Sequence, residues 1–333
     1  MRQFDNHPAL LTARRPTALV AAAAVTAAVT LLTGCGSPTT GTTAPAGAAG
    51  ADGTPTASGT AGPCGASLPS PTGARAPSGL AQRGVRITAV GPACAEYEVT
   101  NPDPEPSDVT VVFGLLAAAG AALDDVTHTV TALAPGATEK RRIDLPPAGP
   151  ARPPARPQVK IAQVRSVPTA EAPRPAGPCP ASGLRLYADQ GDAAMGLRVV
   201  GLHLRNCGTA TVTLDGYPVL QPLDQDHRPV DGVRLLSGGA EIATGTGADN
   251  PPQRIALRPG EGARATLVWR NTTGDGAPVN APYLRVRATP DAAPVTVTPE
   301  LDLGTTGRLG IGAWAREDGD ARPPATRPPA PAG

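Results

Sequence analysis

Cysteine is the residue type of this chain whose spacing says most about its chemistry. Four of the five cysteines fall into two pairs of similar separation, Cys64 with Cys94 and Cys179 with Cys207. A metal site or a reactive thiol at Cys207 would need a second thiol or a histidine within the motif, and residues 206–218 supply neither. Four cysteines allow three pairings, and pairing within each half of the chain is the simplest. We therefore predict the disulfides Cys64–Cys94 and Cys179–Cys207, each worth about 3–4 kcal/mol in the chain-entropy model.

Histidines and clustered carboxylates are the next candidates for catalysis or metal binding. The four histidines, His7, His128, His203 and His227, are scattered, and none belongs to an HExxH or paired-histidine motif. The segment DQDHRPVDG, Asp224–Gly232, gathers three carboxylates and a histidine. Its oxygens admit a calcium site, but the spacing fits no known calcium loop and also suits a polar hairpin tip. We predict no catalytic residue, no metal site and no cofactor, and we expect that the chain is not an enzyme.

The overall composition excludes one class of partner and predicts disorder. The chain has 29 Lys and Arg against 28 Asp and Glu, a formal net charge of +1, which provides no electrostatic footprint for nucleic acid. Pro (41 residues) and Gly (39 residues) are abundant, near the level at which disorder is expected. Because aliphatic and β-branched residues still cluster in places, we expect folded modules that alternate with disordered segments.

The N-terminus has the pattern of an export signal. Arg14 and Arg15 precede an apolar stretch at 18–33, which is short for a membrane span. The stretch ends in LTGC, which resembles the lipobox of bacterial lipoproteins: an aliphatic residue and two small residues before Cys35. This resemblance implies a signal peptide over 1–35, a diacylglyceryl thioether on Cys35 and a further acyl chain such as palmitate. An ordinary cleaved signal or an uncleaved anchor is the alternative, and the Sec and twin-arginine export routes both stay open.

A lipid anchor would place the mature chain on the outer face of the cytoplasmic membrane, in an oxidising space where disulfides persist. Residues 36–63 consist mainly of Thr, Ala, Gly and Pro and lack the apolar bulk needed to order themselves. We predict that they form a disordered tether. The charged and then Pro-rich segment 317–333 is predicted to be a disordered tail.

Hydrophobic residues in the rest of the chain recur with a period of two. Alternating faces are visible in the segments 109–115, 197–206, 263–270 and 283–288. The segments are short and are separated by Gly, Pro, Asn and Asp, which is typical of an all-β protein. We predict two immunoglobulin-like β-sandwich domains, over 64–167 and 179–316, joined by a Pro-rich linker at 168–178.

The two halves share a plan that suggests a loose internal duplication. Each has a Gly-led strand before its second cysteine and later a Pro-Gly turn, in ALAPGATEKRRIDL and in ALRPGEGARATLVW. The register of the duplication has two solutions. One makes Cys94 equivalent to Cys207, whereas the other aligns YEVTNPDP at 97–104 with LHLRNCGT at 202–209 and makes the two cysteines non-equivalent.

The second half also resembles a known family. The segments LRNCGTATVTLDGYPVLQPLDQDHRPVDG, IALRPGEGARATLVWRN and LDLGTTGRLGIGAW together resemble the actinobacterial domain-of-unknown-function family 4232 over about residues 179–314. The elements that carry the resemblance are Asn206 with Cys207, the turn Gly216-Tyr217-Pro218, and Trp269. The resemblance implies an immunoglobulin-like sandwich in an exported lipoprotein, and it transfers no activity. We expect the Tyr217 ring to cap the core, with a ligand contact as the alternative.

Two pairs of arginines are the candidates for a binding face. Arg264 with Arg270, and Arg285 with Arg287, are expected to line one sheet face that meets an anionic wall polymer or lipid headgroups; a merely solvated face is the alternative. We predict a membrane-anchored extracytoplasmic lipoprotein that is a binding or structural module of the cell envelope. Its expected partners are the membrane, through the lipid anchor, and an envelope protein or wall polymer. The alternative is an envelope hydrolase, its accessory subunit, or a small-ligand receptor.

Overall fold

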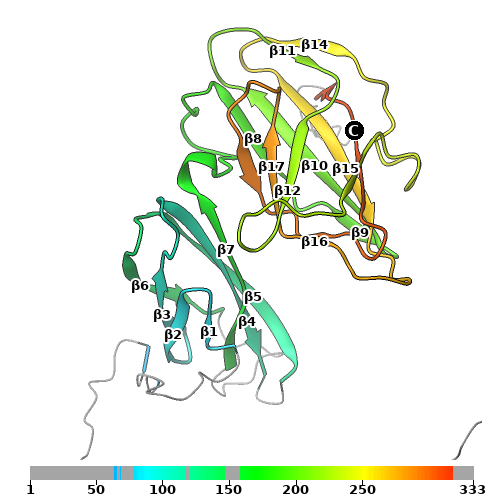
Figure 1. The fold of residues 1–333 in the computed structure, drawn as a ribbon. Coiled ribbons are helices and arrows are strands. Elements are labelled where there is room, and N and C mark those ends of the chain that lie inside the picture. Colours follow the sequence, from blue (N-terminus) through cyan, green and yellow to red (C-terminus); the bar gives the residue numbers. More distant parts are fainter. Residues whose placement is uncertain (1–63, 66–67, 69–78, 118–119, 147–157, 318–333) are drawn as a thin grey trace, which may run out of the picture. The chain divides into compact units, whose positions relative to one another are not determined.

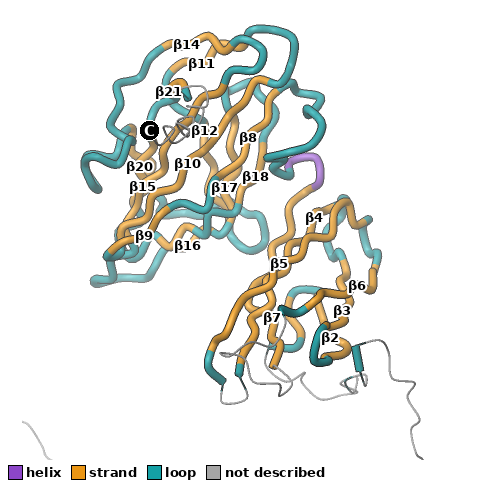
Figure 2. The backbone as a smooth tube through the Cα atoms, turned by 180° about the vertical axis from the view of Figure 1, so that it is seen from behind, coloured by secondary structure: helices purple, strands orange, loops and turns teal. Residues whose placement is uncertain are grey.

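The computed structural model describes residues 64–317 except 66–67, 69–78, 118–119 and 147–157 (Figure 1). The predicted signal peptide with Cys35, the tether and the tail after Glu317 lie outside the described residues. The described part consists of strands and loops with one 3₁₀ helix, Thr169–Glu171, drawn in purple in Figure 2. The all-β prediction is therefore confirmed, whereas an immunoglobulin-like strand order stays a prediction. No helix in the described part is long and apolar enough to span a bilayer.

The first module, up to Pro168, contains two antiparallel sheets. One sheet has the strand order β1-β2-β3-β6 and the other has the order β5-β4-β7. The strands are β1 (Ala81–Gln82), β2 (Val85–Val90), β3 (Cys94–Thr100), β4 (Ser107–Leu116), β5 (Ala122–Leu133), β6 (Thr138–Asp144) and β7 (Gln158–Pro168). Both sheets contribute to a single buried cluster, in which the rings of Tyr97 and Phe113 lie 4.9 Å apart.

Strand β4 shows why the alternating sequence folds in this way. Val109, Val111, Phe113 and Leu115 are buried, and the residues between them are only partly covered. Each such side chain stabilises the fold by about 1.5–3 kcal/mol when it leaves water, so a one-residue slip of register would be costly. The chain then turns before β5 at Gly120, whose φ of 87° lies in the left-handed region that glycine adopts readily.

The second module, from Cys179 onward, is built around a larger sheet. Its main sheet has the order β13-β20-β15-β10-β8, with β9 on β10 and β21 on β15; β12-β17-β18 form a second sheet, and β11-β14 and β16-β19 form small ribbons (Figure 1). The strands are β8 (Leu184–Ala188), β9 (Asp192–Ala194), β10 (Leu197–Asn206), β11 (Val212–Asp215), β12 (Val219–Leu223), β13 (Arg234–Ser237), β14 (Arg254–Leu257), β15 (Gly262–Arg270), β16 (Asn280–Ala281), β17 (Tyr283–Arg287), β18 (Val295–Val297), β19 (Leu301–Asp302), β20 (Arg308–Ile311) and β21 (Ala315–Arg316).

The core of the second module carries both tryptophans of the chain. Trp269 on β15 and Trp314 before β21 are each 1% exposed. Both indole N–H groups have partners, because Trp269 Nε1 donates to Asp302 Oδ1 at 2.6 Å and Trp314 Nε1 donates to the Ala288 carbonyl at 3.0 Å. The two large rings therefore fill the core without leaving a buried donor unpaired.

Both predicted disulfides are present. Cys64 is bonded to Cys94 with a Cα–Cα distance of 5.4 Å, and Cys179 is bonded to Cys207 with a distance of 5.7 Å. Cys207 directly follows β10, and its backbone N–H donates to the Gly183 carbonyl just before β8. The second disulfide thus ties the end of a central strand to the chain entering the neighbouring edge strand.

Two buried asparagines decide the register of the internal duplication. Asn101, after β3, and Asn206, at the end of β10, are 0% and 1% exposed. The Asn101 amide donates to the Glu105 carbonyl (2.9 Å) and the Leu133 carbonyl (2.8 Å), and its Oδ1 accepts from the Asp103 N–H (2.9 Å).

Asn206 makes the same three bonds in the second module. Its amide donates to the carbonyls of Ala210 (2.8 Å) and Leu257 (2.9 Å), and its Oδ1 accepts from the Gly208 N–H (3.1 Å). Each asparagine carbonyl also accepts from the glycine of the following Pro-Gly turn. The alignment of 97–104 with 202–209 is therefore correct, so Cys94 and Cys207 are not equivalent positions.

The start of the predicted linker is held by side chains on both sides of it. Thr169 Oγ1 donates to Asp108 of β4 at 2.7 Å. Glu171 accepts from Arg285 Nε of β17 at 2.8 Å. These two side-chain contacts hold the first residues of the linker in place, so the position of this part does not depend on proline stiffness alone.

Candidate functional site

The four predicted binding arginines do not share a sheet. Arg264 and Arg270 lie on β15 of the main sheet, whereas Arg285 and Arg287 lie on β17 of the three-stranded sheet. The core lies between these sheets, so their outward faces cannot form one surface. The expectation of a common arginine face is wrong because periodicity places residues within a strand but does not assign strands to sheets.

All four arginines have partners within the protein, and Arg264 pairs with Asp189. Arg285 forms a two-armed ion pair with Glu171, which Thr296 Oγ1 also contacts at 2.7 Å. Burial raises the pKa of the Glu171 carboxyl, but the hydrogen bonds from Arg285 and Thr296 outweigh it and hold the pKa below its ordinary value. Arg287 donates to the Ala292 carbonyl and Arg270 to the Ile242 carbonyl. Only Arg264 remains on a surface where other functional groups gather.

The residues of the Gly216-Tyr217-Pro218 turn are structural in this fold. Gly216 has a φ of 70°, and its carbonyl accepts from the Trp314 N–H at 2.8 Å. The Tyr217 ring packs against the core, as expected, and Pro218 is buried. The described contacts do not include the hydroxyl–backbone bond of a tyrosine corner.

The outward face of β8, β10 and β15 carries a group of aromatic and charged side chains. In register across the three strands lie Tyr187, His203 and Arg264. A groove of about 990 Å³ opens over this face, and we call it the outer groove. Its lining includes Tyr187, His203, Arg205, Asn250, Glu261 and Arg316.

His203 is the centre of an ion-pair network at the outer groove. Its Nε2 lies 3.0 Å from Asp189 Oδ2, and its Nδ1 contacts Glu317 Oε1. Arg264 Nη2 donates to the same Asp189 oxygen at 3.3 Å. The Tyr187 ring stacks on the imidazole, with centroids 5.0 Å apart and planes inclined by 10°. We refer to Asp189, His203, Arg264 and Glu317 as the His203 network.

The charges of the network stabilise each other. Burial raises the pKa of the Asp189 carboxyl, but hydrogen bonds from His203 and the Gly201 N–H outweigh it and hold that pKa below its ordinary value. Both imidazole nitrogens contact carboxylate oxygens, one of Asp189 and one of Glu317. Both ring nitrogens are therefore engaged within the protein.

Two glycines make room for the network. A Cβ at Gly201 of β10 would lie 2.4 Å from Asp189 Oδ2 and 2.6 Å from Arg264 Nε. A Cβ at Gly262 of β15 would lie 2.7 Å from Glu317 Oε2. A side chain at either position would displace the ends of these charged groups, so the two outward-facing glycines allow the charged groups to lie flat on the sheet.

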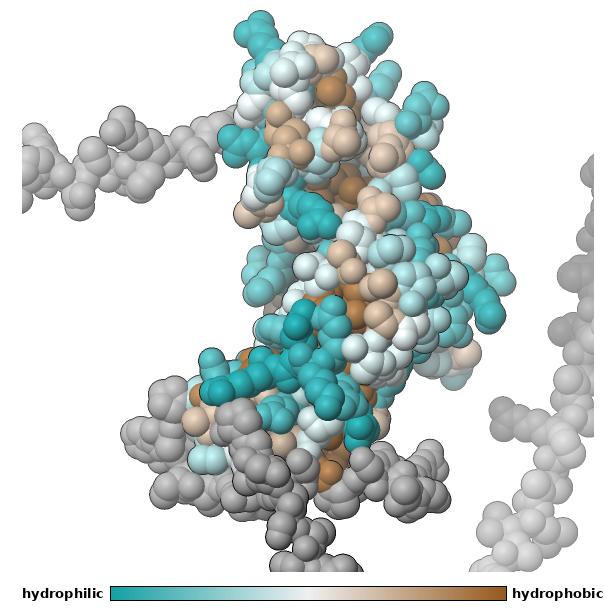
Figure 3. Space-filling model, turned by 90° about the vertical axis from the view of Figure 1, so that its left-hand side faces the viewer, coloured by the Kyte–Doolittle hydropathy of each residue, from teal (hydrophilic) through white to brown (hydrophobic). Residues whose placement is uncertain are grey.

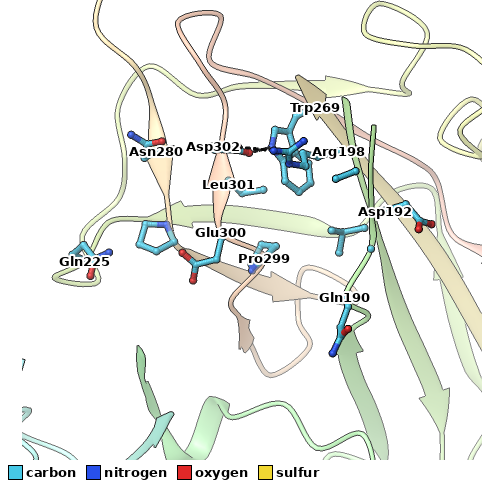
Figure 4. Close-up of a pocket in the computed structure, with 14 residues that line it drawn as sticks. Gln190, Asp192, Arg198, Gln225, Trp269, Asn280, Pro299, Glu300, Leu301 and Asp302 are labelled. Carbon is cyan, nitrogen blue, oxygen red and sulfur yellow. Dashed lines mark hydrogen bonds and ion pairs between the residues drawn. The ribbon is translucent and has the colours of Figure 1, made fainter. Parts of the chain in front are cut away.

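A second concavity, of about 530 Å³, lies at the β9, β16 and β19 end of this module (Figure 4). Its most prominent acid is Asp302, beside Trp269 and Arg198 in the close-up. Asp302 accepts from Trp269 Nε1 at 2.6 Å and from Asn271 Nδ2 at 3.1 Å, and Arg198 lies 3.5 Å away. Both carboxylate oxygens of Asp302 are therefore occupied by contacts within the module. We consider this pocket a weaker candidate for the functional site than the outer groove.

The acidic loop at Asp224–Gly232 has the bonds of a hairpin tip. Asp224 Oδ1 accepts from the backbone N–H of Asp226 (2.8 Å) and of Arg228 (2.9 Å), and these bonds lower the pKa of its carboxyl. Among the described residues no group of three or more His, Cys, Asp and Glu is arranged to hold a metal ion. Asp224 Oδ1 therefore serves as the acceptor that closes this turn.

Exposed apolar side chains do not mark an alternative site. The face drawn in Figure 3 mixes hydrophilic and hydrophobic residues without a continuous hydrophobic area among its described residues. The large hydrophobic residues that the described part exposes are Met195, Val219 and Leu235. Isolated residues of this kind are normal on a protein surface.

Sequence reasoning singled out Arg264 but missed most of its neighbours. Asp189 lies in a loop after β8, and Glu317 was assigned to the disordered tail although the structure places it against His203. The signal that was available is the pair of outward glycines, Gly201 and Gly262, in strands that otherwise alternate regularly.

Comparison with known proteins agrees with the motifs of the second module. Residues 179–315 match the family model described as "Domain of unknown function (DUF4232)". No curated protein matches the chain. A solved structure described as "Crystal structure of putative beta-galactosidase from bacteroides fragilis" is 12% identical, with a TM-score of 0.23 over 68% of this chain and 33% of that one. The chain spans about a third of that protein, and so low a score carries no argument. The second module, which contains the outer groove, is thus a DUF4232-like domain.

Proposed function

We propose that this chain is an exported lipoprotein, anchored through Cys35 on the outer face of the cytoplasmic membrane, that binds a partner in the cell envelope. Support for the location comes from the lipobox-like LTGC sequence and from the two disulfides, Cys64–Cys94 and Cys179–Cys207. Disulfides of this kind persist in oxidising compartments.

The observation that carries the binding role is the outer groove. Exposed charges on a sheet are usually solvated singly, whereas here a histidine, an aspartate, an arginine and a glutamate are fixed against one another. Gly201 and Gly262 supply the space that this arrangement needs. A concave and polar surface whose side chains are already held in place loses little entropy when a ligand binds. The groove therefore serves as the contact surface, with an envelope protein or a wall polymer as partner.

The experiment is crosslinking in intact cells, followed by identification of the material that copurifies. The chain is compared with Cys35→Ala, which removes the lipid attachment, and with Gly201→Ala, which disturbs the groove. We expect one partner to be enriched with the native chain and reduced with both variants. Equal recovery with all three chains would refute the proposal.

The small pocket beside Asp302 favours a second candidate, a small-ligand receptor. Amide side chains of Gln190, Gln225 and Asn280 line this pocket, together with the partly exposed Arg198. A receptor role predicts that binding of a small polar ligand shifts the tryptophan emission, because Trp269 borders this pocket, whereas groove variants such as Gly201→Ala leave that shift unchanged.

A further inference from the structure

One arginine that lines the outer groove has no acidic partner among the residues that the structure describes. Arg264 pairs with Asp189 at 3.3 Å, and Arg316 pairs with Glu261 at 2.8 Å. Arg205 lines the same groove from β10 and is exposed, and it forms no ion pair with any residue that the structure describes. Its guanidinium is therefore the cation of the groove that is available to a ligand.

A second arginine lies next to it. Arg185 on β8 is directly opposite Arg205 in the antiparallel register, on the same outward face as Tyr187 and His203. Like charges directly opposite each other in a sheet are destabilising. Arg185 donates from Nη2 to the Gly177 carbonyl, yet its Nε is buried with no partner among the described groups. The fold thus maintains two adjacent positive charges at a cost that no described acid offsets.

We propose that Arg205, with the charge of Arg185 beside it, binds the acidic group of a saccharide, a carboxylate or a phosphate, lying in the outer groove. The proposal rests on the binding role proposed for this groove and names its ligand class. A guanidinium presents parallel N–H donors that match the two oxygens of such a group. Asn250, Glu261 and the His203 network then face the hydroxyl-rich remainder of the ligand.

The shape and mixed charge of the groove favour a saccharide over a membrane surface. Glu261 and Glu317 lie in the same groove as Arg205, so an extended anionic surface would be repelled beside the point where it is attracted. A saccharide that carries one acidic group for every few hydroxyls can place its acidic group at Arg205 and its hydroxyls at Glu261 and Glu317. The groove is also concave, which suits a chain of sugar units better than a flat bilayer.

The test is a binding titration with defined probes. The protein is the chain with Cys35→Ala, exported so that its disulfides form. The probes are a galacturonate tetramer, its uncharged methyl ester, a phosphorylated glucose tetramer, and vesicles of phosphatidylglycerol. We expect at least one of the two acidic soluble probes to bind, more weakly at high salt because the contact is ionic. The methyl ester should bind at least about tenfold more weakly than the galacturonate tetramer, which is the loss of one charged hydrogen bond.

The variants are Arg205→Gln and, as a matched control, Arg254→Gln. Arg254 is an exposed arginine on β14, outside the groove and likewise without a described ion pair. We expect Arg205→Gln to weaken the acidic probe about ten- to a hundredfold and Arg254→Gln to leave it unchanged. Arg205→Gln should keep or raise the melting temperature, since it removes a like-charge contact.

Three results would overturn the inference: binding only to vesicles, equal binding of the ester and the acid, or equal affinity of the two variants. Its failure is distinguishable from failure of the proposed function. A partner crosslinked in cells equally well by Arg205→Gln would leave the envelope role standing and remove the acidic saccharide. If the acidic probe binds through Arg205 but no partner is crosslinked in cells, the acidic saccharide stands as the ligand and the envelope partner is refuted.

Discussion

Replacing Asn206 by alanine removes the three side-chain hydrogen bonds that join the end of β10 to the Ala210 carbonyl, the Leu257 carbonyl and the Gly208 N–H. The three bonds, 2.8, 2.9 and 3.1 Å long, are made by a side chain on a residue that is 1% exposed. Each such bond is worth about 1 kcal/mol net, and the abandoned backbone groups add a desolvation penalty. We therefore expect Asn206→Ala to lower the free energy of unfolding by about 3–5 kcal/mol.

The duplication supplies an internal comparison. Asn101→Ala breaks the equivalent three bonds in the first module, so its cost should be similar. Both tryptophans, Trp269 and Trp314, are buried in the second module, so their fluorescence reports on that module. Urea unfolding followed by tryptophan fluorescence should shift strongly for Asn206→Ala and much less for Asn101→Ala. Circular dichroism should detect both losses.

The control is Asn250→Ala, which removes an exposed amide with a single 3.5 Å contact. It should change the free energy of unfolding by no more than about 0.5 kcal/mol. A loss below about 1 kcal/mol for Asn206→Ala, or a loss equal to that of the control, would refute the argument that this buried amide organises the module.

Three further predictions concern the second module. Replacing Cys179 and Cys207 by serine should cost about 3–4 kcal/mol, visible as a lower urea midpoint of the fluorescence transition; an unchanged midpoint would contradict it. Gly201→Ala should displace the ends of the Asp189 and Arg264 side chains at a stability cost below about 1 kcal/mol, and it should shift the imidazole NMR signals of His203; unaltered signals would show that the network tolerates the methyl group. The folded-state pKa of Asp189 is depressed, so its stabilising contribution is present above the ordinary pKa of about 3.9 and disappears as the pH falls through the folded value. Asp189→Asn should therefore reduce the loss in free energy of unfolding as the pH falls below about 4. An equal loss in the variant and the native chain would contradict this.

The sequence was sufficient for features that depend on local pattern. The alternation of Val109, Val111, Phe113 and Leu115 predicts the buried face of β4, because neighbouring residues of a strand point to opposite sides. The cysteine spacing predicts both disulfides, since pairing within a module needs no knowledge of how modules pack.

The features that sequence reasoning missed depend on long-range pairing. The His203 network joins β10 to a loop at Asp189 and to Glu317, which are brought together only by the strand order β8-β10-β15-β21. The assignment of Arg264 and Arg285 to one face failed for the same reason, because β15 and β17 belong to different sheets. The register of the duplication could be decided only from the hydrogen bonds of Asn101 and Asn206, because the two aligned segments share no residue other than this asparagine.

The most direct test of the account is site-specific photocrosslinking of the anchored chain in intact cells. A photoreactive residue is placed at exposed Asn250 in the outer groove and, in a matched chain, at exposed Arg254 on β14. We expect a discrete adduct from position 250 that is absent from position 254 and is reduced by Gly201→Ala. Identical adducts from both positions, or none from position 250, would contradict the claim that the outer groove is where this protein meets its envelope partner.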